Sequence, residues 1–376
     1  MRRMKKLSDF TKKANGGEGM SSLKDLLVEF DAIHGVSGDE ERVAQALQAH
    51  LKPVIDEHFE DALGNQVFIK KGSNPDFKVM LAAHMDEIGY IVHNIDSQGF
   101  VYILPVGYHD NRTAFNQVLT IYTEKGPVTG ITGGKPAHIV TPEEAKLAIP
   151  IEELYIDVGT TSKEETLALG VQIGDYLTFQ RTGQFLNDGK IFTGKAVDNR
   201  AACAVMVEAM KRLADKNIVP TVYGVGTVQE EMGIRGSVPV SNRIQPDIGL
   251  ALDVCLSGGT PALTEKDVAV TLGGGPALML YDWTPSTGHG NNVPKKLTRK
   301  LIQAAEKNNI PYQREVVLNG GTDAWAMSVA GNGALASCIS FPSRNIHSAT
   351  GCVHIDDLEY SVQLIVAFIE ALQEKI

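Results

Sequence analysis

Four apolar runs in this sequence each lead into ionisable side chains, and this recurrence constrains the fold more than any other feature. The runs and the residues that follow them are "VMLAA" with His84 and Asp86, "VYGVGTVQ" with Glu230 and Glu231, "IGLAL" with Asp253, and "SCISFPSRNI" with His347. Continuous apolar runs are typical of strands in a sheet that is covered on both faces. In open α/β sheets, ligands bind outside the carboxyl ends of the strands, so side chains that are distant in sequence meet there. The pattern therefore predicts an α/β sheet with these residues at one edge, joined by Asp198 at the start of a helix.

The order of helical and strand patterns divides the chain. Helix-period patterns begin near Ser22 and return after Gly194, where they alternate with the apolar strands. Between 90 and 189, short β-rich runs alternate with Gly, Asn and Pro, and "SKEETLALG" is a short helical pattern among them. We therefore expect one α/β domain formed by 22–89 and 190–376, interrupted by a small β-barrel-type domain over 90–189. Residues 1–21 are basic and polar, which predicts a flexible extension.

Composition limits the classes of function. The chain has 376 residues, 43% of them hydrophobic and 21% charged, so a sizeable core is available. The formal net charge of -10 argues against a nucleic-acid-binding surface, and no apolar run is long enough to span a membrane. The four cysteines show no paired spacing, which predicts a reducing, cytoplasmic location.

The residue types at the predicted sheet edge favour a metal site. Two histidines and three or four carboxylates without cysteine suit zinc, cobalt or manganese. A carboxylate shared between two ions would form a two-metal site, and an unligated carboxylate nearby would serve as general base. Glu230 and Glu231 are candidates to divide these two duties if the strand bends there, and Asp86 is a candidate to orient the His84 ring.

Each of these residues also has an ordinary explanation when it is taken alone. A histidine such as His84 after a strand is commonly a turn or core residue, and a pair such as Glu230 and Glu231 is commonly a solvated strand end. Asp198 is well placed to cap a helix. The pattern alone therefore leaves both a metal or carboxylate active site and a set of ordinary strand ends open.

Three further positions have local roles in this interpretation. We expect Ser37 to be the N-cap of a helix with an acidic first turn, because it precedes "GDEE". We expect Glu87 at the surface, at the hinge into the insertion. Thr322 or Asp323 is expected to cap the helix that follows "NGG".

Six motifs in this sequence together resemble one known family. They are "HMDEIG", "GKAVDNR", "VQEEMGIRGS", "ALDV", "GGTDA" and "RNIHS", in this order. The sequence resembles the glutamyl aminopeptidase/cellulase M family of di-metal aminopeptidases, which includes the tetrahedral dodecameric aminopeptidases. The resemblance extends from about Ser22 to the end of the chain.

The resemblance implies a role for each residue at the sheet edge. It implies two divalent metal ions per subunit, zinc or cobalt, with manganese as a third candidate. Glu230 would be the general base that takes a proton from the attacking water and passes it to the leaving amine. Asp86 would assist catalysis by steadying the ring of His84. The implied metal ligands are His84 and Asp253 for one ion, Glu231 and His347 for the other, and Asp198 as the bridge.

The resemblance also implies an architecture and partners. The expected fold is a three-layer, phosphorylase/hydrolase-like α/β catalytic domain interrupted by a PDZ-like β-barrel domain that serves dimerisation and assembly. The expected partners are short peptide substrates and further copies of the chain in a homo-oligomer, a dodecamer, with no nucleic acid and no membrane. Asn345 departs from the family, which usually has an aromatic residue there, and "GYHDN" replaces a Trp-containing turn. These departures concern the substrate pocket and the assembly rather than the ligands.

The function expected from this resemblance is release of N-terminal residues from short peptides by metal-activated water. One alternative is a glycoside hydrolase of the endoglucanase type, which would use two carboxylates and no metal. Another is a catalytically silent scaffold, which would be expected to lack Glu230 or a ligand. The preferred N-terminal side chain stays open; an acidic preference would need a basic pocket residue, for which Arg344 and Arg235 are candidates.

Overall fold

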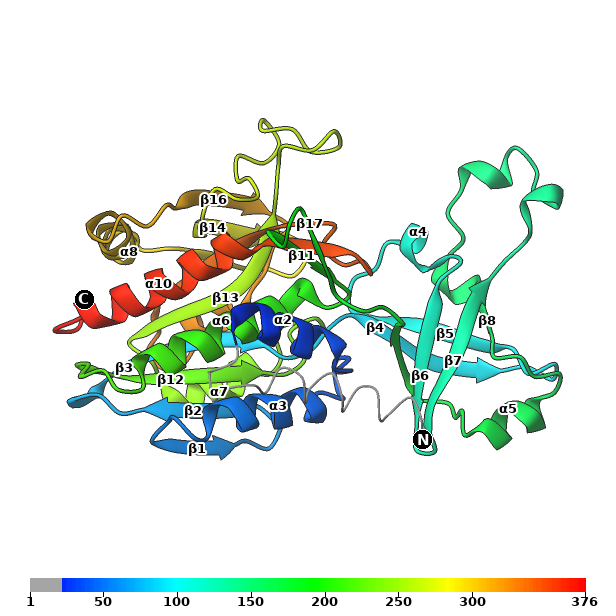
Figure 1. Cartoon of the computed structure of the whole chain (residues 1–376), viewed down its shortest axis with the longest axis horizontal. Coiled ribbons are helices and arrows are strands. Elements are labelled where there is room, and N and C mark those ends of the chain that lie inside the picture. Colours follow the sequence, from blue (N-terminus) through cyan, green and yellow to red (C-terminus); the bar gives the residue numbers. More distant parts are fainter. Residues whose placement is uncertain (1–21) are drawn as a thin grey trace.

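The computed structural model describes residues 22–376 and arranges them in two bodies. One body is a large sheet covered by helices, and the other is a small β-barrel with short helices and loops (Figure 1). The predicted flexible extension, residues 1–21, lies outside the described residues. Within the described residues, every helix falls short of the length and hydropathy that a membrane crossing requires.

The large sheet has twelve strands in the described chain. They are β1 (Glu57–Glu60), β2 (Gln66–Lys70), β3 (Asn74–His84), β10 (Gln184–Leu186), β11 (Ile191–Gly194), β12 (Pro220–Thr227), β13 (Ile248–Leu256), β14 (Ala277–Thr284), β15 (His289–Asn292), β16 (Gln313–Leu318), β17 (Leu335–Arg344) and β18 (Gly351–His354). Nine of them follow the order β1-β2-β12-β3-β13-β17-β18-β11-β10, and β14 to β16 extend from β17. The central four, β12, β3, β13 and β17, are parallel to one another.

The apolar runs form the parallel centre, as the sequence predicts. Val79, Met80 and Leu81 of β3 are fully buried, as are the facing residues Val222 of β12 and Leu250 of β13. Their carboxyl ends lie at the same edge of the sheet because the four strands run in one direction.

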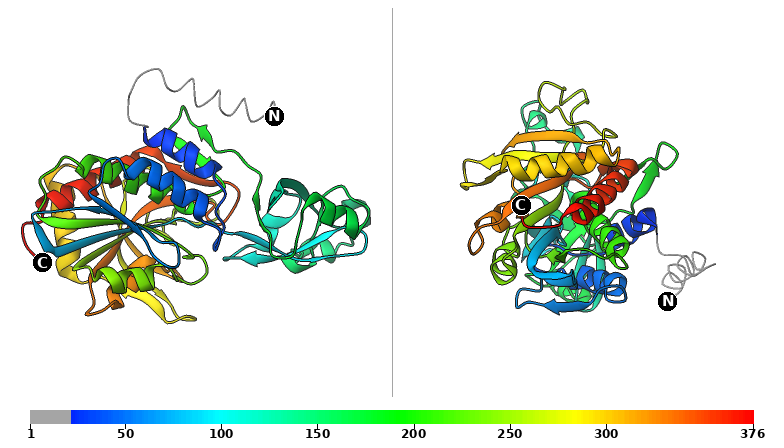
Figure 2. Two further views of the ribbon diagram at one scale, coloured as in Figure 1. Left: turned by 90° about the horizontal axis from the view of Figure 1, so that it is seen from below. Right: turned by 90° about the vertical axis from the view of Figure 1, so that its left-hand side faces the viewer.

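Helices cover both faces of this sheet, which gives three layers (Figure 2). One face carries α2 (Leu23–Ala32), α3 (Glu41–Leu51), α6 (Val197–Leu213), α8 (Lys295–Lys307) and α10 (Ile355–Ala371). The other carries α7 (Ser237–Ile244) and α9 (Asp323–Val329). Helix α6 lies between β3 and β13 on one side and α2 and α10 on the other, and it is therefore buried on nearly all sides. Burial of one side chain such as Met206 stabilises the fold by roughly 1.5–3 kcal/mol.

The second body is a closed antiparallel barrel with a core of its own. Its strands, in the order β4-β5-β8-β7-β6-β9, are β4 (Gly89–Ile95), β5 (Val101–Val106), β8 (Tyr155–Asp157), β7 (Gly126–Gly133), β6 (Val118–Thr123) and β9 (Tyr176–Phe179). Ile103, Leu119 and Leu177 are fully buried inside it. The predicted helix in "SKEETLALG" is α5 (Lys163–Leu169), and a short α4 (Asn111–Ala114) precedes β6. The predicted α/β fold with an inserted β-barrel is thus confirmed.

The chain passes from barrel to sheet over a few residues. Strand β9 ends at Phe179, and β10, which begins at Gln184, already pairs with β11 of the large sheet. On the other side, β3 ends at His84 and β4 begins at Gly89. The barrel therefore leaves the large sheet directly beside the edge where the predicted site lies.

Candidate metal centre

The residues predicted from the strand ends come together in the structure. His84 ends β3, and Asp253 lies in β13. Glu230 and Glu231 follow β12, His347 follows β17, and Asp198 lies at the start of α6. One cleft of about 370 Å³ is lined by His84, Asp198, Glu230, Glu231, Asp253 and His347. Asp86 lies behind them and is fully buried.

Asp198 stands between the two histidines. Its Oδ1 lies 3.1 Å from Nε2 of His84, and its Oδ2 lies 3.2 Å from Nε2 of His347. Asp253 approaches His84 on one side, with Oδ1 3.7 Å from Nε2, and Glu231 approaches His347 on the other, with Oε2 3.3 Å from Nε2. The five side chains therefore form two His–carboxylate pairs that share one carboxylate.

Asp86 holds the surroundings of His84 in place. Its Oδ1 lies 3.3 Å from Nδ1 of His84, so Nε2 is directed toward the cleft. The same carboxylate accepts hydrogen bonds from the backbone N–H groups of Glu230 and Glu231, at 3.0 and 3.1 Å. Ser37 donates its hydroxyl to Asp86 Oδ2 at 2.5 Å. Asp86 thus links the end of β3 to the segment after β12.

This contact corrects the expected role of Ser37. Helix α3 begins at Glu41, its N-cap is Glu40, and no side chain caps its first turn. The Ser37 hydroxyl instead donates to a buried carboxylate 49 residues away in the chain. The predicted cap of α9 is confirmed, because Thr322 accepts a hydrogen bond from the backbone N–H of Ala324.

The inserted barrel contributes to the position of His347. Nδ1 of His347 lies 2.8 Å from the backbone carbonyl oxygen of Tyr108, in the turn that follows β5. A carbonyl oxygen only accepts, so this contact places the proton on Nδ1 and leaves Nε2 to face Asp198 and Glu231. The sequence patterns do not predict this contact, because a backbone carbonyl carries no residue-type signal.

The two glutamates leave the strand before they reach the cleft. Strand β12 ends at Thr227, and Gln229 has a φ of 53°, which turns the backbone away from the strand direction. Both side chains can therefore line the same cleft. Burial, with Asp253 and Asp323 nearby, raises the pKa of Glu230 well above its usual range. Glu230 thus lies beside the His–carboxylate pairs without an ion pair of its own in the described chain.

The donor set fits divalent cations. Four carboxylates surround two imidazoles, and Oε1 of Glu231 is buried without a hydrogen-bond partner in the described chain. Ligand atoms of His84, Asp198 and Glu231 lie within 4.8 Å of one another. Burial alone would lower the pKa of His347, but its hydrogen bonds to Asp198 and Glu231 raise that pKa to about 11. The cluster therefore favours positive charge, and mixed imidazole and carboxylate ligands suit zinc, cobalt and manganese.

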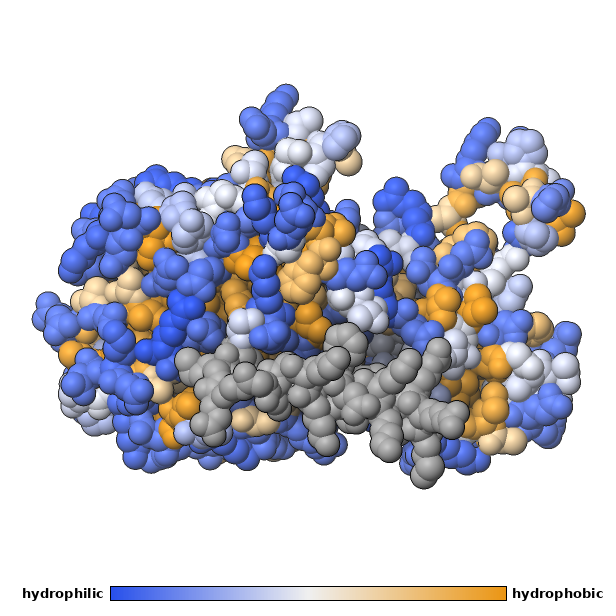
Figure 3. Space-filling view, viewed as in Figure 1, coloured by the Kyte–Doolittle hydropathy of each residue, from blue (hydrophilic) through white to orange (hydrophobic). Residues whose placement is uncertain are grey.

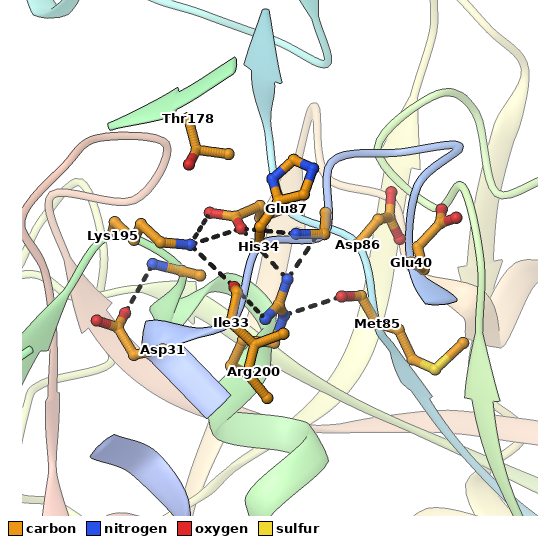
Figure 4. A network of polar contacts seen from close by, with 12 residues as sticks. Asp31, Ile33, His34, Glu40, Met85, Asp86, Glu87, Thr178, Lys195 and Arg200 are labelled. Carbon is orange, nitrogen blue, oxygen red and sulfur yellow. Dashed lines mark hydrogen bonds and ion pairs between the residues drawn. The ribbon is translucent and has the colours of Figure 1, made fainter. Parts of the chain in front are cut away.

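Glu87 is buried, so its expected position at the surface is wrong. Lys195 contacts both of its carboxylate oxygens at 2.6 Å, and Arg200 lies 3.3 Å from one of them (Figure 4). Arg200 also donates to the backbone carbonyls of Met85 and Phe30, both at 2.8 Å. The next residue after Asp86 thus points away from the cleft, into a separate ionic network under the start of the barrel.

Two further acids line the same cleft and are absent from the sequence prediction. They are Asp282 on β14 and Glu315 on β16. Asp282 follows the apolar run "ALMLY", the same signal as at the other strand ends, and could have been found in that way. Glu315 lies within "QREVVL", where no apolar run precedes it, so it carries no such signal. Arg235 and Arg344, the basic candidates from the sequence, do not line the cleft.

Comparison with curated proteins gives several relatives of nearly full length. A putative aminopeptidase of Acetivibrio thermocellus is 36% identical over 91% of this chain and 97% of its own. A lysyl aminopeptidase of Pyrococcus furiosus is 33% identical, with 90% and 94% covered. A glutamyl aminopeptidase of Lactococcus lactis is 29% identical, with 93% and 96% covered.

Solved structures share the fold. An aminopeptidase from the archaeon Desulfurococcus kamchatkensis has a TM-score of 0.88 at 35% identity, covering 93% of this chain and 95% of its own. The TET1 peptidase of Pyrococcus horikoshii, described as assembling into a tetrahedron or a large octahedral shell, has a TM-score of 0.82 at 33% identity, with 93% and 100% covered. A protein of Thermotoga maritima described as an endoglucanase has a TM-score of 0.73 at 29% identity, with 94% and 97% covered.

A family model described as M42 glutamyl aminopeptidase matches residues 64–364, a range that includes all seven residues at the sheet edge. The relatives of nearly full length agree with it. The chain therefore belongs to the M42 glutamyl aminopeptidase family and is a hydrolase of peptide bonds.

Proposed function

We propose that this chain is a co-catalytic di-metal aminopeptidase that releases N-terminal residues from short peptides. The observation that carries the proposal is Asp198, each of whose carboxylate oxygens faces the Nε2 of a different histidine. In the proposal, His84 and Asp253 hold one divalent ion, Glu231 and His347 hold the other, and Asp198 bridges them. Zinc and cobalt fit these ligands, and manganese is a third candidate.

The residues around the ions divide the work of hydrolysis. Divalent ions in such sites polarise the scissile carbonyl and acidify water. Glu230 accepts the proton of the attacking water and donates it to the leaving amine, a task that suits a carboxyl whose pKa burial has raised. Asp86 is a positioning residue, because it orients His84 and the backbone of Glu230 without lining the cleft.

The name of one structural neighbour suggests a glycosidase, and the site argues for peptide hydrolysis instead. The Thermotoga maritima protein is described as an endoglucanase. Glycoside hydrolysis needs two carboxylates across a sugar bond. It gives no role to two histidines that share Asp198. The names of the relatives do not fix the substrate either, since one is a lysyl and another a glutamyl aminopeptidase.

We also propose a homo-oligomer, built through the barrel. Large apolar side chains are exposed on this body, among them Val118, Ile131, Ile139 and Leu147, the last of which is 75% exposed. Figure 3 shows apolar residues gathered on the surface of this body. Exposed apolar patches of this kind mark association surfaces. A dodecamer is the proposed state, and a hollow assembly would admit short peptides only. The proposed roles are thus catalysis for 22–89 and 190–376 and assembly for 90–189, in the cytoplasm.

The test combines metal content with turnover. Chelator-stripped protein is assayed on aminoacyl p-nitroanilides, with and without added Zn²⁺ or Co²⁺, and bound metal is measured by mass spectrometry. We expect activity to return as two ions per subunit bind. Asp198→Asn should lose the second ion and the activity together. Full activity at one ion per subunit, or in the stripped protein, would contradict the proposal.

A further inference from the structure

The cleft has two ends with different linings. One end holds the histidines and their carboxylates, and the other is formed by β14, β16 and the end of β13. Met279, Val317 and Leu256 give this second end apolar walls. Asp282 and Glu315 place two carboxylates among them. This end is therefore an apolar pocket that contains two carboxyl groups.

Neither carboxyl group forms an ion pair within the described chain. Asp282 is 1% exposed and Glu315 is 8% exposed. One oxygen of Asp282 accepts a hydrogen bond from the backbone N–H of Asn291, whereas Oδ2 has no hydrogen-bond partner in the described chain. Among the described residues, no lysine, arginine or histidine lies within ion-pair distance of either acid. A buried carboxylate without a partner is costly, and either a proton or a bound cation offsets that cost.

Burial raises the pKa of both carboxyl groups, Asp282 and Glu315. It raises the pKa of Asp282 to about 6, and it raises that of Glu315 to about 7 with a contribution from Asp282. The Ser340 hydroxyl and the Cys255 thiol are the neighbouring polar groups of Glu315, and neither carries a positive charge.

The shape and lining of the pocket indicate which cation it binds. A lysine or arginine side chain has an apolar stem and a charged head, and it buries the stem along apolar surface. Met279 and Val317 suit the stem, and the two carboxylates suit the head. Within the described chain no lysine or arginine lines the cleft, so an acidic side chain would find no such partner beside Asp282 and Glu315.

We propose that this pocket selects substrates with lysine or arginine at the N-terminus, and that Asp282 and Glu315 bind the cationic head. The inference rests on the proposed aminopeptidase function, because it assigns the side-chain pocket of that same site. It makes both acids specificity-determining residues rather than catalytic ones.

The test compares a charged substrate with an uncharged one of similar length. The metal-loaded full chain is assayed on lysyl- and norleucyl-p-nitroanilide, which share the apolar stem. We expect the wild type to favour lysine in kcat/KM, and Asp282→Asn and Glu315→Gln each to lower the lysine-to-norleucine ratio by about tenfold or more. Asp76→Asn is the matched control, since Asp76 is exposed near the opposite end of β3 and its loss should leave the ratio unchanged.

Two outcomes would overturn the proposal. One is a wild type that cleaves the norleucine substrate as well as the lysine substrate. The other is an equal loss on both substrates in the two variants, which would mean that the acids bind the α-amine or support the fold. If no substrate is cleaved, the proposed function fails. The preference of the pocket can still be tested by comparing the affinities of lysinamide and norleucinamide by calorimetry. Equal affinity for these two amides would refute it.

Discussion

The end of β3 separates two clusters of buried charged residues, one in which cations outnumber the carboxylate and one in which carboxylates outnumber the imidazoles. On the side of Glu87, one carboxylate meets two cations, Lys195 and Arg200, and the remaining donors of Arg200 find backbone carbonyls. On the cleft side, carboxylates outnumber the imidazoles, and Glu231 keeps an unpartnered oxygen. A buried charge is tolerated when it is paired. The first cluster pairs its carboxylate within the chain, whereas the second has the ligand types and the unpartnered oxygen of a candidate metal site.

The largest expected effect is the loss of turnover in Glu230→Gln. This change keeps the shape of the side chain and removes its ability to carry the proton, so kcat should fall by roughly 10²–10⁴-fold. Bound metal, measured by mass spectrometry, should stay at the wild-type level. Turnover within tenfold of the wild type would refute the general-base role.

A substitution in the cluster of Glu87, Lys195 and Arg200 should lower the stability of the fold rather than the rate of turnover. Glu87→Gln leaves Lys195 and Arg200 buried without their carboxylate, and breaking such a pair should cost about 3–5 kcal/mol in the free energy of unfolding. Urea unfolding followed by fluorescence reports on this body, because Trp283 and Trp325 both lie in it.

The matched control for Glu87→Gln is Glu57→Gln. Glu57 pairs with Lys71 at the surface, and solvent screening should make the loss of this exposed pair much smaller than that of the buried one. Equal losses of unfolding free energy in the two variants would show that the buried network stabilises the fold no more than an exposed ion pair does.

Glu315 should make the stability of the metal-free protein depend on pH. Burial raises its pKa to about 7 in the folded state, whereas the unfolded chain titrates near the ordinary value of 4.5. Between these values the folded state holds the proton more often, so stability falls as pH rises from 4.5 to 7, by roughly 3 kcal/mol. In Glu315→Gln the slope should be shallower by this amount, while Glu40 and Asp282, whose pKa values burial also raises, keep their own contributions. A thermal melting difference between variant and wild type that stays constant from pH 4.5 to 8 would contradict this account.

The smallest expected effect is that of Ser37→Ala. It removes one of the three hydrogen bonds to Asp86 that do not involve His84, and the two backbone donors remain. Loss of such support should lower metal affinity by about tenfold, measured by competition with a chelator. Ser22→Ala, which removes only the exposed cap of α2, serves as the control. An unchanged affinity would show that the backbone donors alone position Asp86.

The sequence predicts the fold class and the clustering of seven residues because six of them lie at or after apolar strand runs and the seventh, Asp198, lies at the start of a helix. Each apolar run ends at a charged residue, and a parallel sheet brings those ends together without further information. The burial of Glu87 could not be predicted in this way. Its partners Lys195 and Arg200 lie more than 100 residues away, and their pairing depends on how α6 docks against the turn after β3.

The positions of Ser37 and Glu315 could not be predicted from the local sequence pattern either. Ser37 precedes an acidic helical turn, and its local pattern suggested a cap, yet a tertiary contact with Asp86 prevails. Glu315 has no such pattern, because no apolar run precedes it in β16. Asp282 differs, since the run "ALMLY" before it carries the strand-end signal.

The hydrogen bond from His347 to Tyr108 means that the ring of one proposed ligand is set by another part of the molecule. An exchange of barrels between relatives would therefore be a change to the active site, even though no catalytic side chain is replaced. Because the bond involves a backbone oxygen, substitution of Tyr108 cannot remove it. Only a shift of the whole turn can do so. If His347 holds a metal ion as proposed, catalysis depends on how the barrel is positioned against the large sheet.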